Sequence, residues 1–246
     1  MYLTITGLVL RVTNYNDTDA LLTVLTPDRG KLTLKARGLR RKNNPLTAPC
    51  QLLCYSNFTL FENKGYYSIN EASVNELFHP LRKDLQKLSL ATYFAQVADV
   101  MSQEDMPNPQ LLSLLLNCLY ALCNLQIPEA QIKAVFELRM IVLGGYTPDL
   151  SGCAYCQCGY PDRFHLSQGH LECSRCSGSQ EGIRLPVFPG TLDAMRYICY
   201  CDDKKIFSFI LGEEAIEQLS QVTEGYLVTQ LERGFSALDF YKTLLI

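Results

Sequence analysis

The spacing of apolar positions divides the chain into a strand-rich first part and a helical remainder. Over roughly the first 75 residues, apolar side chains alternate with polar ones or form short aliphatic runs, as half-buried strands do. Turn residues at 26–30 and 62–65 separate such runs and predict hairpins. We predict strands at residues 2–13, 20–26, 31–35, 51–61 and 66–69. Strands this close together, without a helix between them, favour a small barrel of the OB-fold type.

From Leu77 onward the apolar period becomes helical. Leu77, Leu81, Leu85 and Leu88 follow spacings of three and four residues, which predicts one amphipathic helix. Prolines and the glycine pair at 144–145 bound the segments that follow. We predict helices at residues 77–101, 110–125, 129–143, 190–200, 212–233 and 238–245.

One uncharged stretch, residues 106–128, is long enough to be compared with a membrane span. Its apolar centre, residues 111–125, would be about 22 Å long as a helix, short of the roughly 30 Å hydrocarbon core of a bilayer. Flanking prolines and Asn117 and Asn124 argue against a span as well. We therefore expect a buried helix of a bundle, and no membrane partner.

Two cysteine pairs carry the clearest chemistry in the sequence. Each is a C-x-x-C, and sixteen residues separate the two pairs. A thiolate pair at this spacing folds over one metal ion, and a second pair completes the tetrahedral sulfur site that Zn²⁺ prefers. Because four thiolates leave no position for water or substrate, we expect one structural Zn²⁺ per chain, bound by Cys153, Cys156, Cys173 and Cys176.

Other cysteines and histidines are less convincing ligands. Cys158, His165 and His170 are near in sequence, but four thiolates already complete the metal shell. Six further cysteines lie in apolar segments, as small core residues do: Cys50, Cys54, Cys118, Cys123, Cys199 and Cys201. Residues 1–6 have no basic region that would begin an export signal, so we expect free thiols in a reducing cytoplasm.

Charge is small overall but unevenly distributed. The net charge of −3 combines +3 over residues 1–80, with nine Lys and Arg against six Asp and Glu, and −6 over the rest. Such asymmetry points to a partner for the basic part. We call residues 31–42 the basic segment, because they hold six cations and no acid: Lys31, Lys35, Arg37, Arg40, Arg41 and Lys42.

The basic segment is the candidate surface for nucleic acid. Lys31, Lys35 and Arg37 occupy alternate positions and share one face of the predicted strand, and Gly38 then leads into a basic loop. On a barrel, this is a track for a phosphate backbone, at a place where OB-folds often contact single strands. The alternative is a solvated strand face and loop. Nearby aromatic residues belong to the core or stack on bases: Phe58, Tyr66 and Tyr67.

No familiar catalytic arrangement is found in the sequence. It lacks the phosphate-binding loop, the nucleophile elbow, the HExxH zinc sequence and the dinucleotide-binding glycine pattern. The acidic pairs Asp17/Asp19 and Asp202/Asp203 are expected to be solvated turn residues rather than a metal-dependent nuclease site. We therefore expect a binding protein with no catalytic residues, not an enzyme.

The order of several short segments resembles a known family over essentially the full length. The matching segments are Asn-Asp-Thr-Asp at 16–19, the apolar run at 21–26, Gly-Lys-Leu at 30–32, Ala-Arg-Gly at 36–38 and Leu-Gly-Gly-Tyr-Thr-Pro at 143–148. Together with the cysteine pairs, their order and spacing are similar to those of the bacterial RecO recombination-mediator family, which acts in DNA repair. Residues 231–238 are less basic than the lysine-serine segment of many members.

The resemblance implies a fold and a function. It implies an α+β, multidomain chain: an OB-fold that binds nucleic acid at 1–78, a helical domain at 79–149 and 181–246, and an inserted zinc element with four cysteine ligands at 150–180. Proteins of this family bind single- and double-stranded DNA, anneal complementary strands and interact with the single-strand-binding protein SSB. With RecR they help to load RecA, so we expect a cytoplasmic, nucleoid-associated protein whose DNA contacts are the six cations of the basic segment.

Other classes of protein fit part of the pattern. A zinc-containing transcription or RNA-binding factor would share the basic barrel but prefer one sequence or RNA. A non-catalytic structural adaptor would leave the basic loop without a ligand, and a metal-dependent nuclease fits least. Binding to unrelated single strands, with annealing and no cleavage, would separate all of these from the mediator.

Overall fold

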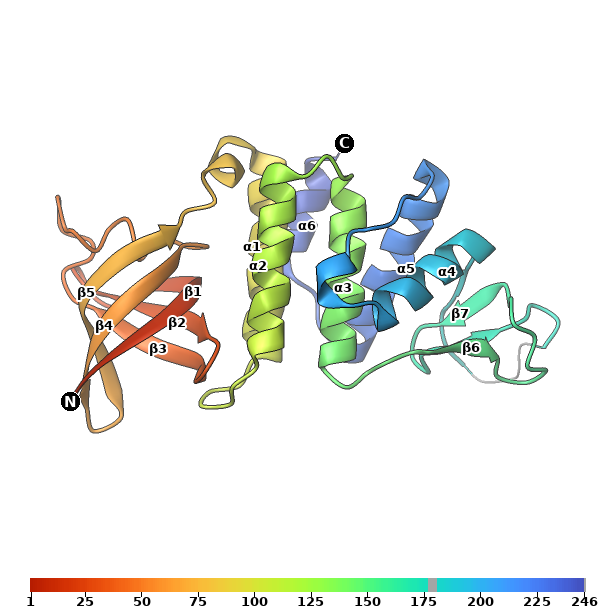
Figure 1. Cartoon of the computed structure of the whole chain (residues 1–246), viewed down its shortest axis with the longest axis horizontal. Coiled ribbons are helices and arrows are strands. Elements are labelled where there is room, and N and C mark those ends of the chain that lie inside the picture. Colours follow the sequence, from red (N-terminus) through yellow and green to blue (C-terminus); the bar gives the residue numbers. More distant parts are fainter. Residues whose placement is uncertain (177–180, 246) are drawn as a thin grey trace. The chain divides into compact units, whose positions relative to one another are not determined.

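The N-terminal strands close into a barrel with OB-like character, which confirms the predicted α+β fold class (Figure 1). The computed structural model describes residues 1–176 and 181–245. Around the barrel the strands follow the order β1-β2-β3-β5-β4, and β4 pairs with β1 to close it. Their bounds are β1 (Tyr2–Asn14), β2 (Ala20–Thr26), β3 (Gly30–Ala36), β4 (Tyr55–Asn63) and β5 (Tyr66–Glu76).

Strict alternation of side chains builds the barrel core. Along β3, Leu32, Leu34 and Ala36 are buried, whereas Lys31 and Lys35 lie on the outer face. The buried positions of the other strands meet them in one cluster, which includes Phe58 and Cys50. Lys31 and Lys35 therefore lie on the same outer face of β3, as the alternation predicts.

The largest differences from the predicted elements lie around the end of the barrel. Strand β4 begins at Tyr55 rather than at residue 51, because the chain turns at Leu53 with a φ of +62°. Strand β5 runs on to Glu76, and Phe78 then reverses the chain with a φ of +48°. The helical period that begins at Leu77 in the sequence becomes a helix only after Asp84, whose side chain accepts a hydrogen bond from the N–H of Lys87.

The remaining helices match the predicted ones to within two residues at each end. The helices are α1 (Leu85–Met101), α2 (Pro109–Asn124), α3 (Glu129–Leu143), α4 (Pro189–Tyr200), α5 (Glu213–Leu231) and α6 (Ser236–Thr243). Short 3-10 turns occupy His79–Lys83 and Asp203–Lys205. In the parts of the chain that the structure describes, no helix has the length and apolar character needed to cross a bilayer.

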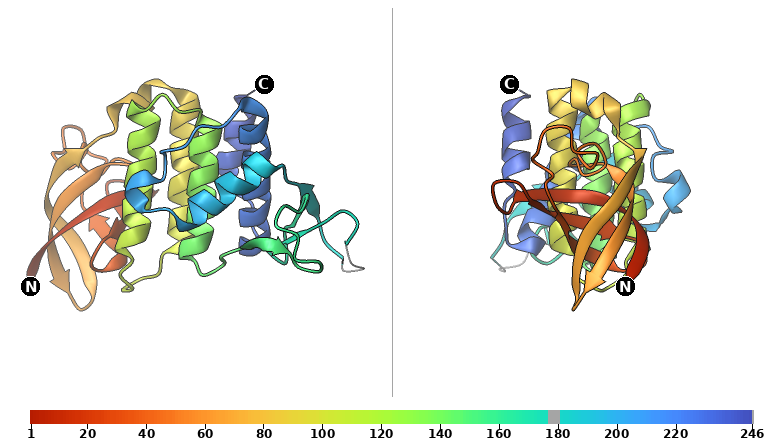
Figure 2. Two further views of the ribbon diagram at one scale, coloured as in Figure 1. Left: turned by 45° about the vertical axis from the view of Figure 1, so that its right-hand side comes forward. Right: turned by 90° about the vertical axis from the view of Figure 1, so that its left-hand side faces the viewer.

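The chain forms two compact units. The first contains Met1–Leu125 together with Phe235–Ile246, because α6 returns to pack along α1 (Figure 2). There the amide of Gln86 donates to the carbonyl of Leu244 at 2.7 Å, and the rings of Tyr93 and Phe235 lie 5.5 Å apart. This unit holds the barrel and therefore the basic segment.

The second unit, Gln126–Gly234, contains α3, α4, α5 and a small sheet. The sheet has the order β6-β8-β7-β9, from β6 (Asp149–Cys153), β7 (Arg163–His165), β8 (His170–Glu172) and β9 (Arg184–Pro186). It forms the element that carries the two cysteine pairs. Residues 177–180, which belong to the predicted zinc element, lie outside the described residues.

The cysteines of the apolar segments lie largely in the interior, as expected. Cys50, Cys54, Cys118 and Cys199 are buried, and burial raises the pKa of Cys50 and of Cys199 to about 12. Cys123 and Cys201 are half-buried. These thiols stay protonated at neutral pH and pack as small apolar side chains.

Candidate metal centre and nucleic-acid interface

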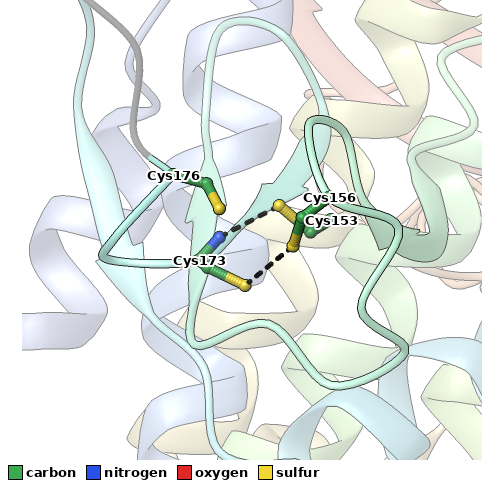
Figure 3. Close-up of side chains that lie close together, drawn as sticks. All are labelled: Cys153, Cys156, Cys173 and Cys176. Atoms are coloured by element: carbon green, nitrogen blue, oxygen red, sulfur yellow. Dashed lines mark hydrogen bonds between the residues drawn. The ribbon is translucent and has the colours of Figure 1, made fainter.

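The two cysteine pairs meet beside the small sheet of the second unit (Figure 3). Cys153 ends β6, and Cys173 directly follows β8. The four sulfur atoms all lie within 4.8 Å of one another, and those of Cys156 and Cys173 are 3.7 Å apart. A tetrahedral site with Zn–S bonds of about 2.3 Å would hold its sulfurs about 3.8 Å apart. The four cysteines are thus close enough to bind one metal ion.

Main-chain hydrogen bonds shape the first cysteine pair into a tight turn. The N–H of Cys153 donates to the carbonyl of Cys158 at 2.8 Å, and the N–H of Gln157 donates back to the carbonyl of Cys153 at 2.9 Å. A Cβ atom on Gly152 would lie 2.8 Å from the Cys158 carbonyl oxygen, which explains the glycine. Cys158 thus supplies a carbonyl to the turn, whereas its exposed thiol lies outside the cluster.

The thiols of the cluster differ in how easily they ionise. Burial opposes ionisation of Cys153, but the N–H groups of Cys156, Tyr155 and Cys173 point at its sulfur and lower its pKa to about 6. Burial and the neighbouring thiol of Cys156 raise the pKa of Cys173. Several thiolates in so small a volume repel one another, so a cation is needed to hold them all ionised. This chemistry fits a metal bound by four thiolates.

On the barrel, the first cation of the basic segment is bound within the chain. The Nζ atom of Lys31 donates to the main-chain oxygen of Asp99 in α1 at 2.6 Å and lies 3.0 Å from its Oδ1. Gly30 has a φ of +60°, and a Cβ there would collide with the carbonyl oxygens of Met106 and Gln103. The start of β3 is therefore covered by α1 and the segment that follows it. Only 19% of the Lys31 side chain is exposed.

An acidic residue lies among the later cations. Asp19 accepts a hydrogen bond from the N–H of Gly38 at 2.8 Å and forms an ion pair with Lys35 at 3.2 Å. The Gly38 hydrogen bond is the main reason why the pKa of Asp19 falls to about 2. The expectation that Asp19 is a solvated turn residue was wrong, since only 14% of its side chain is exposed.

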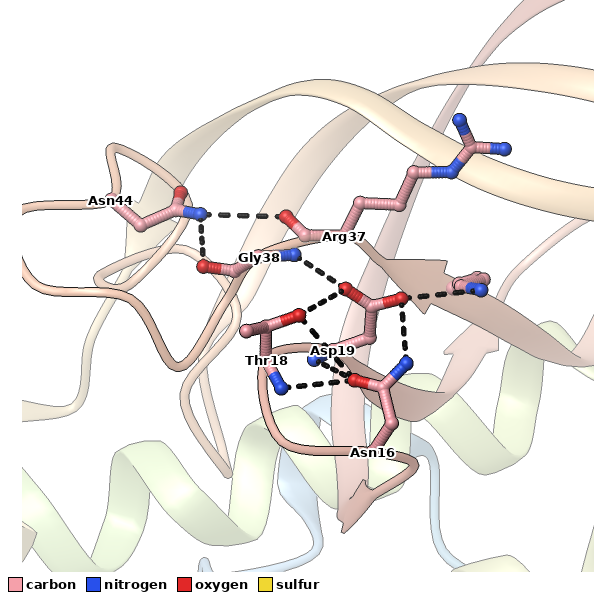
Figure 4. A network of polar contacts seen from close by, with 7 residues as sticks. Asn16, Thr18, Asp19, Arg37, Gly38 and Asn44 are labelled. Atoms are coloured by element: carbon pink, nitrogen blue, oxygen red, sulfur yellow. Dashed lines mark hydrogen bonds and ion pairs between the residues drawn. The ribbon is translucent and has the colours of Figure 1, made fainter.

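The same network holds the loop of the basic segment (Figure 4). The main-chain N–H of Arg40 donates to the carbonyl of Thr18 at 3.0 Å, and its guanidinium donates to the carbonyl of Asn16 at 2.9 Å. On the other side, the amide of Asn44 donates to the carbonyl of Gly38 at 2.6 Å. The loop is thus fixed by its main chain, while its four cationic side chains are exposed: Arg37, Arg40, Arg41 and Lys42.

The three aromatic candidates near the basic segment differ in their placement. Phe58 is completely buried in the barrel core, so its suggested role as a stacking surface was wrong. Tyr66 is 80% exposed, and Tyr67 is half-buried. Both line a hollow of about 420 Å³ that also borders Lys35 and Arg37. Tyr15 and Phe61 border the same hollow and were not predicted, although Phe61 follows the alternation of β4 outward from the buried Leu60.

Comparison with known proteins covers almost the whole chain. The family model described as Recombination protein O N terminal matches residues 1–78, which contain the barrel. The model described as Recombination protein O C terminal matches residues 82–239, which include the cysteine cluster.

Individual relatives agree with these family models. The DNA repair protein RecO of Acetivibrio thermocellus is 35% identical over 99% of this chain and 97% of its own length. The proteins of the same name from Alkaliphilus metalliredigens and Bacillus subtilis are 30% and 29% identical, over 97% and 89% of this chain and 98% and 86% of their own lengths. The barrel, the helices and the cysteine element thus match as a whole, and the chain belongs to the RecO family of recombination proteins.

Proposed function

We propose that this chain is a recombination mediator of DNA repair that binds single- and double-stranded DNA through its barrel. The observation that carries the proposal is the ordered loop of exposed cations on the outer face of the barrel: Arg37, Arg40, Arg41 and Lys42. Relatives over the full length are named for DNA repair, which supports the same role.

The loop suits a sugar–phosphate backbone better than a particular base sequence. Its cations project from a main chain that Asp19, Thr18 and Asn44 hold in place, so they can meet successive phosphates with little reordering of the loop. Contacts of this kind position a strand and carry no sequence information. Cationic side chains bound to phosphates also reduce the repulsion between two strands, and annealing of complementary strands requires this reduction.

Lys31 contributes least among the six candidate cations. Its ammonium group is already paired with Asp99, and moving it to a phosphate would break two close contacts. Lys35 is intermediate, because it is partly exposed but paired with Asp19. The proposed DNA surface therefore runs from Lys35 through Arg37 to the loop.

The proposed role extends to partners and to a structural metal. We infer that the protein acts on SSB-coated DNA and, together with RecR, promotes RecA loading in the cytoplasm at the nucleoid. It does so as a binding protein without turnover. The four-cysteine cluster would bind one Zn²⁺ that stabilises the small sheet. We propose three functional parts with the boundaries predicted from the sequence. Residues 1–78 would bind DNA, residues 79–149 and 181–246 would form the helical domain, and residues 150–180 would form the zinc element.

Strand annealing tests the proposal directly. Complementary oligonucleotides coated with SSB should anneal faster with the protein than without it, and neither strand should be cleaved. Replacing Arg40 and Arg41 by alanine should slow annealing and weaken binding about equally for unrelated sequences. The slope of log affinity against log salt should become shallower by roughly 1.4, about 0.7 for each lost phosphate contact on a single strand.

A matched control comes from the second unit. Lys204 and Lys205 are also adjacent exposed cations, but they lie on the short turn before α5. Their double alanine variant should anneal strands as the wild type does. Equal losses in both double variants would mean that net charge alone matters. A preference for one sequence, or for RNA, would favour the transcription or RNA-binding factor instead.

A further inference from the structure

We propose that the outer face of the barrel beside the basic segment is a site for unstacked bases, so that this chain distinguishes single strands from duplexes by aromatic side chains. The inference rests on the proposed DNA binding and adds a set of aromatic residues to it. The basic segment would bind phosphates in both kinds of DNA. The aromatic face would bind only bases that are free to leave a stack.

Strand register builds this face. Tyr2 lies opposite Phe61, Phe61 opposite Ser68, and Ser68 opposite Lys35, on the neighbouring strands β1, β4, β5 and β3. Directly opposed residues point to the same side of a sheet, so these four form one row across the outside of the barrel. Within the row, the small Ser68 separates the ring of Phe61 from the ammonium group of Lys35. A depression between a ring and a cation results.

Two adjoining hollows occupy this depression. One, of about 420 Å³, is bordered by Tyr15, Tyr66, Tyr67 and Lys35. The other, of about 300 Å³, extends toward Tyr2. Both are bordered by Phe61, Ser68 and Arg37, so the hollows meet at these residues. Their volumes lie at the lower end of the range for small-ligand sites, roughly 300–1,000 Å³.

The aromatic side chains here are exposed rather than used in the core. Tyr66 is 80% exposed, Tyr2 64%, Tyr15 59% and Phe61 41%. Tyr2 and Phe61 lie with their ring centres 5.4 Å apart, and both remain accessible. Large exposed rings gathered on one face of a protein mark a binding surface. Flat faces of this size suit the stacking of bases, which any base sequence allows.

The charged residues beside the rings favour a nucleic acid strand as the ligand of this face. The Nζ atom of Lys35 lies 4.8 Å from the centre of the Tyr15 ring, and Arg37 points away from the Asp19 network in Figure 4. Two cations thus border the same depression as the rings, as a single strand carries phosphates beside its bases. An apolar peptide offers no acceptor to these cations, whereas a nucleic acid strand offers phosphates to the cations and bases to the rings. In a duplex the bases stay stacked inside the helix, so the rings of the barrel cannot reach them.

Three probes separate base binding from phosphate binding: an oligothymidylate, an abasic strand of the same length and a duplex of the same length. The wild-type protein should bind the oligothymidylate about tenfold more tightly than the abasic strand. Tyr66→Ala should remove most of this preference and leave binding to the abasic strand and to the duplex unchanged. Tyr66→Phe keeps the ring and should bind all three probes as the wild type does. A loss of the preference in this variant would instead assign the binding to the hydroxyl group.

Matched controls keep the result interpretable. Tyr120 is 56% exposed on α2 and borders neither hollow, so Tyr120→Ala should not affect any probe. Phe61→Ala should act like Tyr66→Ala. If Phe61→Ala lowers the melting temperature, the Tyr66 variants carry the test, since their highly exposed ring contributes little to folding.

The outcomes distinguish this inference from the proposed function. Equal wild-type affinity for the oligothymidylate and the abasic strand would overturn the base site. An equal loss of duplex and single-strand binding in Tyr66→Ala would overturn it as well. If annealing then still depended on Arg40 and Arg41, DNA binding by the basic segment would stand without the base site. If the wild-type protein bound none of the three probes, both proposals would fall.

Discussion

The Oδ1 atom of Asp19 accepts a hydrogen bond from the N–H of Gly38 at 2.8 Å, across nineteen residues of chain. Its second oxygen lies 3.2 Å from the ammonium group of Lys35. One carboxylate therefore connects the turn before β2 to the loop after β3. An acid in the middle of a cationic surface weakens that surface electrostatically, but here it holds the main chain that presents the cations.

The first prediction concerns pH. Asp19 has its pKa lowered from an ordinary value of 3.8 to about 2. A lowered pKa in the folded state stabilises the protein above pH 3.8, and this stabilisation disappears as the pH falls from about 4 to about 2. The difference in unfolding free energy between the wild type and Asp19→Asn should accordingly be constant from pH 5 to 7, roughly, and shrink in that acidic window.

Thermal melts of both proteins over this pH range provide the measurement. Asp17→Asn is the matched control, because Asp17 is an exposed residue of the same turn. Asp17→Asn should leave the free energy of unfolding at pH 7 close to that of the wild type, because the side chain is exposed. If the difference in unfolding free energy between the wild type and Asp19→Asn stayed constant down to pH 2, the carboxylate would not hold the loop in solution.

The second prediction separates Lys31 from the other cations. Lys31→Ala should leave DNA affinity and its salt dependence close to those of the wild type, because the ammonium group already binds Asp99. The free energy of unfolding should fall by about 1–2 kcal/mol, since a mostly buried, charge-assisted contact is lost. Denaturation and oligonucleotide titration measure the two effects.

Arg37→Ala is the control for Lys31→Ala. The Arg37 side chain is exposed, so we expect the opposite result: weaker DNA binding and unchanged stability. A loss of DNA affinity in Lys31→Ala as large as that in Arg37→Ala would mean that Lys31 leaves Asp99 to contact a phosphate.

Lys31 and Lys35 show which features of the DNA surface the sequence can predict and which it cannot. Alternation along β3 correctly places Lys31 and Lys35 on one outer face, because side chains of a strand point to opposite sides in turn. The pattern of one strand contains no information about what packs on that face. Asp99 lies 68 residues after Lys31, and only the packing of α1 on the barrel brings them together.

The small sheet of the second unit was also predicted only in part. The spacing of the cysteines was enough to predict their cluster, since metal ligands obey local geometry. The strands β7, β8 and β9 were not predicted, because each has only three residues and shows no usable period. Two of the aromatic rings beside the basic segment were not predicted, for another reason. Tyr2 and Phe61 come from strands that meet only when the barrel closes.

The third prediction concerns a buried charge between α3 and α5. The Nζ atom of Lys133 lies 3.0 Å from Glu137 and 2.8 Å from Glu224, and Thr223 donates to Glu137 at 2.8 Å. Glu137 is fully buried, and burial raises its pKa. Lys133→Met would remove the cation and leave the buried Glu137 without its counter-ion, which should cost about 3–5 kcal/mol of stability.

Hydrogen exchange along α3 and α5 measures this loss within the second unit. A double variant, Lys133→Met with Glu137→Gln, removes both charges and should recover part of the protection. Lys204→Met, at an exposed site of the same unit, should have little effect. Full protection in Lys133→Met would show that the charged network contributes little to the packing of these helices.

The last prediction is that the cysteine cluster binds one Zn²⁺ per chain as a structural site. Protein purified under reducing conditions should contain close to one equivalent of zinc, and Cys173→Ser should lose it, because three thiolates hold the ion poorly. Cys158→Ser is the matched control. Its thiol lies outside the cluster and its contribution to the turn is a carbonyl, so this variant should keep the metal.

Loss of zinc should have a local structural effect that can be measured apart from metal content. The strands β6 and β8 end at or next to Cys153 and Cys173, so their amides should lose protection from hydrogen exchange in Cys173→Ser and in chelator-treated wild type. The barrel has its own core and should keep its protection. A zinc content below about 0.2 per chain in reduced wild type would contradict the site, as would loss of zinc from Cys158→Ser. Loss of protection in the barrel would instead show that the cluster supports more than its own sheet.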